Sequence, residues 1–146
     1  MIEVLDIGEI RLQEKESFIV DCQSPDGKWV AVFEDNAESG CLYLCTWDAK
    51  SGKLIGIMDN LWIYDAIWPS IEEFDDVFIT WSDDSTRFAL IVEDECWGII
   101  DLQAMRKLAA PREDNCIREI DFEFWEKGLS NQDGEALQLE KLQVQF

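Results

Sequence analysis

The sequence predicts a mainly β protein that forms a single domain over residues 1–146. Short runs of β-branched and aromatic residues recur between turn signals rich in Pro, Gly, Asp and Ser. The stretch 24–53, SPDGKWVAVFEDNAESGCLYLCTWDAKSGK, shows this most clearly, with the strand-like runs 29–33 and 41–47 between three turns. The expected architecture is two related antiparallel meanders and a C-terminal hairpin. They are expected to pack as a sandwich or half-open barrel, with at most one or two short helices.

An internal repeat is the second observation behind this prediction. When Ser24 is placed on Ser82, Asp26 falls on Asp84 and the run VAVF falls on FALI. The two copies cover about residues 18–58 and 76–108. Each has the order strand, Ser-Asp turn, strand, acidic turn, strand, basic turn, strand, which is the order of an antiparallel meander.

The repeat has recurring motif residues in its Ser-Asp turn, in the strand that follows and after the third strand. They are Ser24, Asp26, Gly27, Ala31, Asp48 and Gly52, and again Ser82, Asp84, Ala89 and Asp101. This pattern resembles a blade of a WD40-type β-propeller, which implies antiparallel meanders. A propeller needs at least four blades of about 40–45 residues each, so two copies are too few to close one. The chain also resembles small uncharacterised bacterial proteins of the immunity-protein kind, which implies a toxin as partner.

Three further segments carry local signals. Residues 2–12 show mixed alternation and are expected to form a strand. Residues 70–76, SIEEFDD, are expected to form one short helical turn, with Ser70 as its N-cap and acids in its first turn. Residues 102–110 contain good helix formers and are expected to depart from the strand pattern of the first copy.

The C-terminal part alternates between apolar and polar residues. The segments IREIDFEFW (117–125) and ALQLEKLQVQF (136–146) both follow this period, and KGLSNQDGE lies between them as a turn. The expected structure is therefore a hairpin over about 117–146. A phase slip near Glu140 indicates a bulge in its second strand.

Charge and composition limit the function classes. The chain has 12 basic and 32 acidic residues and a formal net charge of −20. Such a field repels nucleic acid and anionic membranes and attracts basic proteins and cations. No apolar run approaches the ~20 residues of a membrane helix, and the N-terminus is acidic rather than signal-like. The five Cys contain no CxxC spacing, so reduced thiols and a cytoplasmic location are expected.

No catalytic motif stands out. The chain has no His, which removes the Ser-His and Cys-His dyads and the commonest general base. Asn131, Asp133, Gly134 and Glu140 match part of a calcium loop, but Leu129 holds its first position and the flanks are strand-like, so a hairpin turn is expected. No cofactor or metal is predicted. A carboxylate-based or divalent-cation-dependent enzyme remains an alternative, because paired carboxylates act as acid and base where burial separates their pKa values.

The positions of the charges carry the functional prediction. In a four-strand meander, alternate turns lie at opposite ends of the sheet. One end is expected to hold the basic residues Lys28, Lys50, Lys53, Arg87, Arg106 and Lys107. The other is expected to hold acids and aromatic anchors that bind a partner: Glu34, Asp35, Glu38, Trp62, Tyr64, Trp68, Glu72, Glu73, Asp75, Asp76, Glu93, Asp94 and Glu95.

The predicted function is a non-catalytic, acidic, cytoplasmic binding protein that masks a basic protein partner. Acids would steer the encounter, and buried aromatics would anchor it. The sharpest form of this prediction is an immunity protein against a bacterial toxin. A homo-oligomeric structural module, with exposed strand edges and Trp driving a homodimer, is a further alternative. The prediction requires that acidic turns from both copies lie on one rim and that the aromatics there are accessible.

Overall fold

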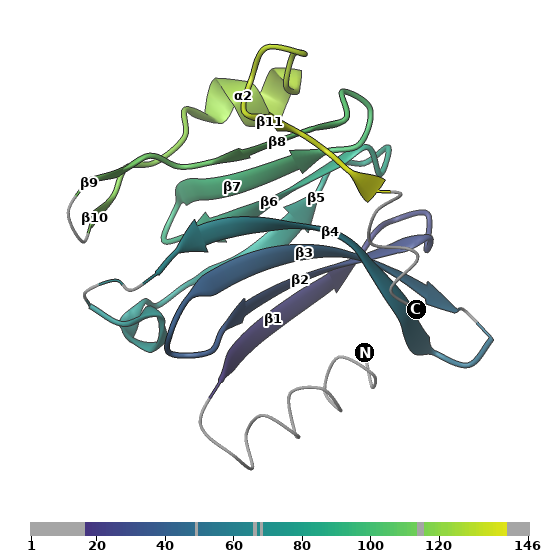
Figure 1. Ribbon diagram of the computed structural model, residues 1–146, viewed down its shortest axis with the longest axis horizontal. Coiled ribbons are helices and arrows are strands. Elements are labelled where there is room, and N and C mark those ends of the chain that lie inside the picture. Colours follow the sequence, from purple (N-terminus) through teal and green to yellow (C-terminus); the bar gives the residue numbers. More distant parts are fainter. Residues whose placement is uncertain (1–16, 49, 66, 68, 114–115, 140–146) are drawn as a thin grey trace.

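The computed structural model describes residues 17–48, 50–65, 67, 69–113 and 116–139. Two antiparallel sheets pack face to face in a sandwich-like arrangement (Figure 1). The first sheet has the order β1-β2-β3-β4 and comprises β1 (Phe18–Gln23), β2 (Trp29–Asp35), β3 (Gly40–Asp48) and β4 (Lys53–Tyr64). The second has the order β11-β8-β7-β6-β5 and comprises β5 (Val77–Trp81), β6 (Arg87–Val92), β7 (Glu95–Asp101), β8 (Arg106–Ala109) and β11 (Glu135–Ala136).

Three smaller elements complete the described chain: the 3₁₀ turn η1 (Ile71–Glu73), the hairpin of β9 (Arg112–Glu113) and β10 (Cys116–Ile117), and the helix α2 (Phe122–Lys127). The predicted fold class is confirmed, because consecutive strands of each copy pair as an antiparallel meander. The short helical turn predicted after Ser70 is also present as η1.

The main core lies between the sheets, where alternate residues of both meet. Phe33, Leu42 and Leu44 from the first sheet belong to one buried cluster with Phe88 and Leu90 from the second. Burial of this apolar surface is the main stabilising term. The second sheet is also covered on its outer face, where segments 120–129 pack on β6 and β7. This double burial explains the unbroken apolar run of β6.

The two Ser-Asp turns have the same hydrogen bonds. The Ser24 hydroxyl donates to Asp26 Oδ1 (2.6 Å). The Ser82 hydroxyl donates to Asp84 Oδ1 (2.7 Å). The turns also touch each other, since the Asp26 amide donates to Ser85 Oγ (3.0 Å). Equivalent turns of the two copies therefore lie side by side at one end of the sandwich.

The C-terminal hairpin is not formed as predicted, and this expectation is corrected. Residues 122–127 form the helix α2 in place of a strand. Its caps explain the difference: the Asp121 side chain accepts from the Glu123 amide (2.9 Å), and Gly128 ends the helix with φ 87°. Lys127 pairs with Glu123 one turn away (2.6 Å). These local caps outweigh the alternating pattern of the Phe residues.

The rest of the C-terminal prediction is also changed. β11 has two residues and pairs with β8, so the terminal segment extends the second sheet. The expected departure from strand at 102–110 is wrong for its second half, because β8 pairs with β7 over 106–109. A turn precedes β8, closed by the Ala104 amide donating to Asp101 Oδ1 (2.9 Å). The predicted strand at 2–12 and the bulge near Glu140 lie outside the described residues.

Candidate functional site

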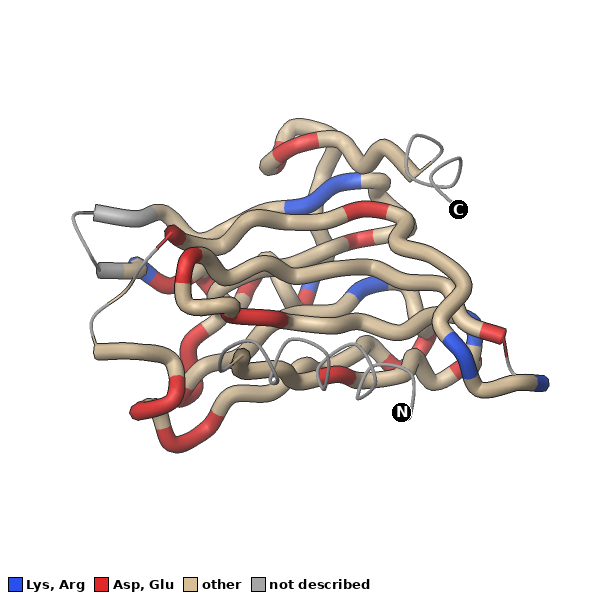
Figure 2. Tube along the Cα trace, turned by 60° about the horizontal axis from the view of Figure 1, so that its bottom comes forward, with Lys and Arg blue, Asp and Glu red and all other residues tan. Residues whose placement is uncertain are grey.

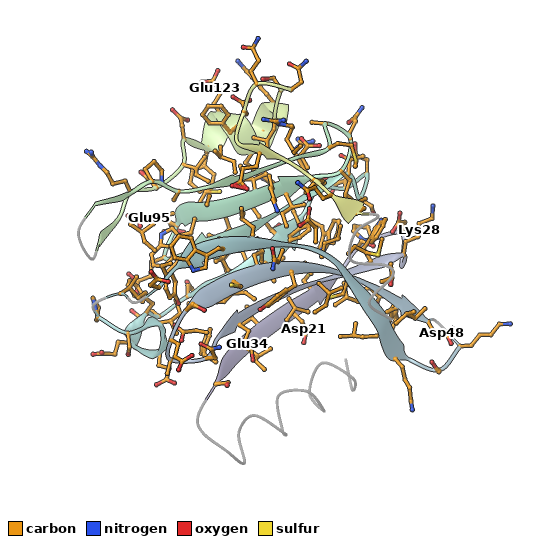
Figure 3. The ribbon with its side chains drawn as sticks, viewed as in Figure 1. Asp21, Lys28, Glu34, Asp48, Glu95 and Glu123 are labelled. Carbon is orange, nitrogen blue, oxygen red and sulfur yellow. The ribbon has the colours of Figure 1, made fainter. Side chains whose placement is uncertain are left out.

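Acidic turns from both copies lie at one end of the sandwich, which we call the acidic end. It consists of the β2–β3 turn (36–39), the β6–β7 turn (93–94) and the segment 69–76, with the strand residues beside them. In Figure 3, Glu34 and Glu95 lie at this end, opposite Lys28 and Asp48. Figure 2 shows acidic segments gathered at the same end, on the left of the view. The segment 69–76 is held against the β6–β7 turn, because the Asp75 amide donates to Glu93 Oε2 (2.8 Å).

Buried aromatic residues join the two acidic turns. The Tyr64 hydroxyl donates to Asp35 Oδ2 (2.6 Å), and the Tyr64 ring meets Trp97 edge-on with centroids 6.2 Å apart. Trp97 in turn donates from Nε1 to Glu95 Oε1 (3.1 Å) and packs against Phe74. A continuous set of contacts thus runs from Asp35 in the first copy to Glu95 in the second. It holds these carboxylates in fixed positions.

Tyr64 is therefore part of the scaffold and not a partner anchor, which corrects its predicted role. Its side chain is 1% exposed and lies in the main core. Burial, with the Asp35 carboxylate beside it, raises the pKa of the Tyr64 phenol. Gly40 makes room for the ring, since a Cβ at Gly40 would lie 2.5 Å from Tyr64 Cζ. The sequence shows an aromatic here but cannot show which way it points.

The other predicted aromatics have different outcomes. Trp62 follows the alternation of β4 to the surface and is 42% exposed. Its cross-strand partner Cys41 is the second residue of β3, next to the β2–β3 turn, so Trp62 lies at the acidic end. Trp68 lies outside the described residues. Trp97 was missed by the sequence analysis, because its place within an apolar strand gives no sign of contact with the acidic turns.

The predicted acids differ in accessibility. Glu34 lies in β2 and is 8% exposed, so it offers little surface to a partner. Asp35 and Glu95 are half-buried and held by the aromatic residues described above. All of the others are exposed: Glu38, Glu72, Glu73, Asp75, Asp76, Glu93 and Asp94. The structure thus brings the predicted acids to one end, with the exposed ones on its turns.

The opposite end is less basic than the sequence analysis expected. Three of its six basic residues are held by other parts of the chain. Arg87 donates to the carbonyl oxygens of Trp125 and Glu126, Arg106 to those of Asp133 and Gly134, and Lys107 to the Asp59 carboxylate. Arg87 and Arg106 thus attach the C-terminal segments to the second sheet, and Lys107 joins that sheet to β4 of the first. Asp26 and Asp84 lie in turns at that end, and Asp48 ends β3 beside a third turn, so the surface charge there is mixed.

A basic residue also reaches the acidic end. The β9–β10 hairpin projects there, at the left of Figure 1. Arg118 follows β10 directly, is exposed, and donates its amide to the Pro111 carbonyl (2.8 Å). The sequence does not predict this position, because the hairpin lies after both copies and its direction is set by tertiary packing.

Other chemistry is limited within the described residues. They contain no group of three or more Cys, Asp or Glu side chains placed to hold a metal ion. The turn at 130–133 is closed by its own side chain, since Asp133 Oδ2 accepts from the Ser130 amide (2.8 Å). Glu140, the last residue of the calcium-loop match, lies outside the described residues. No helix in the described ranges is both long and apolar enough to cross a bilayer.

The thiols lead to a prediction on pH. Burial raises the pKa of Cys45 and of Cys96 to about 12, from an ordinary value of 9.0. Each thiol then favours the folded state fully below pH 9, and this contribution is lost as the pH rises from 9 toward 12. The melting temperature is expected to fall over this interval. A Cys45→Ala variant, although less stable at neutral pH, should show a smaller fall, and an equal fall would contradict the assignment.

Comparison with known proteins places the chain in a family. A family model described as "uncharacterized protein conserved in bacteria (DUF2251)" matches residues 12–137. The chain belongs to DUF2251. Searches of the curated proteins and of the solved structures gave no match. The DUF2251 match supports the bacterial, uncharacterised part of the resemblance noted from sequence, and its description names neither a propeller nor an immunity function.

Proposed function

We propose that this DUF2251 protein is a non-catalytic binding protein whose acidic end covers a basic protein partner. The observation that supports this most directly is the contact path from Asp35 through Tyr64 and Trp97 to Glu95. It fixes acidic turns from two different copies as one rigid surface. A fixed arrangement of like charges costs folding energy through repulsion, which is offset when an oppositely charged surface binds.

The features of the acidic end match what recognition of a basic surface requires. Exposed carboxylates, such as those of Glu72 and Asp94, raise the rate of encounter with a cationic partner. Trp62 offers a large apolar side chain beside them, the residue type that most often anchors an interface. A cytoplasmic bacterial toxin with a cationic groove, such as a nuclease, is the partner class that we favour.

The test compares two charge-matched variants. Glu72→Gln with Asp94→Asn removes two exposed carboxylates from the acidic end, and neither side chain has a hydrogen bond to a described residue. Asp83→Asn with Glu126→Gln removes the same charge elsewhere on the surface. A partner captured from extract of the source bacterium would be purified and titrated at low and moderate salt. The first variant is expected to lose about tenfold in affinity at low salt, and the second about twofold or less.

Two results would count against the proposal. Equal losses in both variants would mean that the net charge acts without a defined site. An affinity that does not change with salt would mean that the exposed carboxylates do not contribute to the encounter.

A further inference from the structure

A groove lies where the two sheets meet along β4 and β8. It has a volume of about 530 Å³, within the size range of ligand-binding clefts. Trp62 and Asn60 of β4 form one wall, and residues 107–111 form the other. Gly134 and Glu135, at the start of β11, close one side. Both walls are sheet edges, since β4 is the last strand of its sheet and β11 covers only part of β8.

The edge of β8 is open at Ala109. β11 pairs with Arg106 and Lys107 and no further. On the other side of β8, the Ala110 amide donates to the Trp97 carbonyl (3.0 Å), so residues 106, 108 and 110 direct their backbone groups toward β7. By alternation, the amide and carbonyl of Ala109 are directed away from β7, past the end of β11. Within the described chain, no strand pairs with Ala109 on this side.

The lining suits a segment that is both apolar and basic. Trp62 is 42% exposed, and Leu108, Ala109 and Pro111 give the opposite wall apolar surface. The exposed Glu135 carboxylate belongs to the lining. Among the described residues of the lining, the cation is Lys107, which is held by Asp59 Oδ1 (2.9 Å) and by the Asn60 carbonyl (2.7 Å). Its charge is thereby balanced and does not oppose a basic occupant.

We propose that this groove binds an extended segment of the basic partner, which pairs with β8 at Ala109 as an additional strand. This inference rests on the proposed function and names how the partner is held. Strand addition to a sheet edge uses main-chain hydrogen bonds for affinity and flanking side chains for selectivity. Trp62 would pack on side chains of the added strand, and the adjoining acidic end would select for Lys or Arg in it.

The test uses a labelled, end-blocked hexapeptide, Lys-Val-Lys-Val-Lys-Val, and fluorescence anisotropy. Wild-type protein is expected to bind it in a saturable manner. Trp62→Ala is expected to weaken binding about tenfold, because an exposed anchor is removed. Ala109→Pro is expected to weaken it about fivefold or more, because the free amide is lost. Proline is tolerated at a strand position whose amide has no partner, so the variant should remain folded.

A second probe keeps the test decisive if Ala109→Pro does not fold. The same peptide with N-methyl groups on alternate residues cannot donate along one edge, and wild-type protein is expected to bind it at least fivefold more weakly. Failure of the unmodified peptide to bind would overturn the groove proposal. So would binding that is unchanged by both substitutions and by N-methylation. The proposed function would survive either result if the purified partner still distinguishes the two charge variants.

Discussion

Replacing Lys107 by Met is expected to lower the free energy of unfolding by about 3–5 kcal/mol. The Lys107 ammonium lies 2.9 Å from Asp59 Oδ1, and the two side chains are only 11% and 5% exposed. Asp59 Oδ2 also accepts from the Gln138 amide (2.8 Å), so this carboxylate joins both sheets to the C-terminal segment. Without the ammonium, the carboxylate stays buried with its charge uncompensated. Urea unfolding measures the loss.

Two further variants isolate the cause of that loss. Lys127→Met removes the cation of the exposed pair with Glu123, whose side chains are 72% and 60% exposed, and should cost less than about 0.5 kcal/mol. Combining Lys107→Met with Asp59→Leu removes both buried charges and should restore part of the stability. If the two single Lys variants were equally stable, the buried pair would not be the structural link that we infer.

The second large effect is expected at Trp97. Trp97→Ala should lower the free energy of unfolding by about 3–5 kcal/mol, because a buried indole is removed from between Tyr64 and Phe74. Trp97→Phe keeps an aromatic ring there and loses the hydrogen bond to Glu95, so it should cost less, about 1–2 kcal/mol. Thermal and urea unfolding compare the two.

Trp62→Ala is the matched control at the same end of the molecule. Trp62 is 42% exposed, so its removal should cost well under the value for Trp97, about 1 kcal/mol or less. In the proposed function the two residues have different roles: Trp97 holds the acidic turns together, and Trp62 would contact the partner. A large loss of stability in Trp62→Ala with no loss of binding would reverse these roles.

Partner binding at the acidic end is expected to depend on the core. The path from Asp35 to Glu95 crosses between the sheets, so a variant that loosens the core also loosens the acidic end. Trp97→Phe should leave nearly all of the protein folded, so its loss of stability alone would not change the partner affinity. The affinity is nevertheless expected to fall, because the acidic turns are held less firmly. The acidic end and the core act as one unit in this proposal.

Local signals in the sequence determined the two meanders. The Ser-Asp turns use contacts between residues close in the chain, such as Ser24 with Asp26, and the same residues recur in the second copy. Strand alternation then follows from burial of one face. The order of strands places alternate turns of one meander at opposite ends of its own sheet. That the acidic turns of both copies share an end depends in addition on how the two sheets pack, as the contact between Asp26 and Ser85 shows.

Only the tertiary structure decided which side chains are accessible and which segments leave the pattern. Tyr64 and Trp62 are two residues apart in β4 and would share one face of a regular strand. Tyr64 is buried and Trp62 is exposed, because the pairing of β4 with β3 shifts register between these two residues. The sequence predicts Lys107 as one of the cations at the basic end of the sheet. In the structure it is largely buried and pairs with Asp59 of the other sheet. Alternating Phe residues fit a strand as well as α2, and the caps together with packing on the outer face of the second sheet select the helix. The caps of α2 are local, but the partner that decides the outcome at Tyr64 and Lys107, and the sheet face on which α2 packs, are distant in the chain and are brought close only by folding.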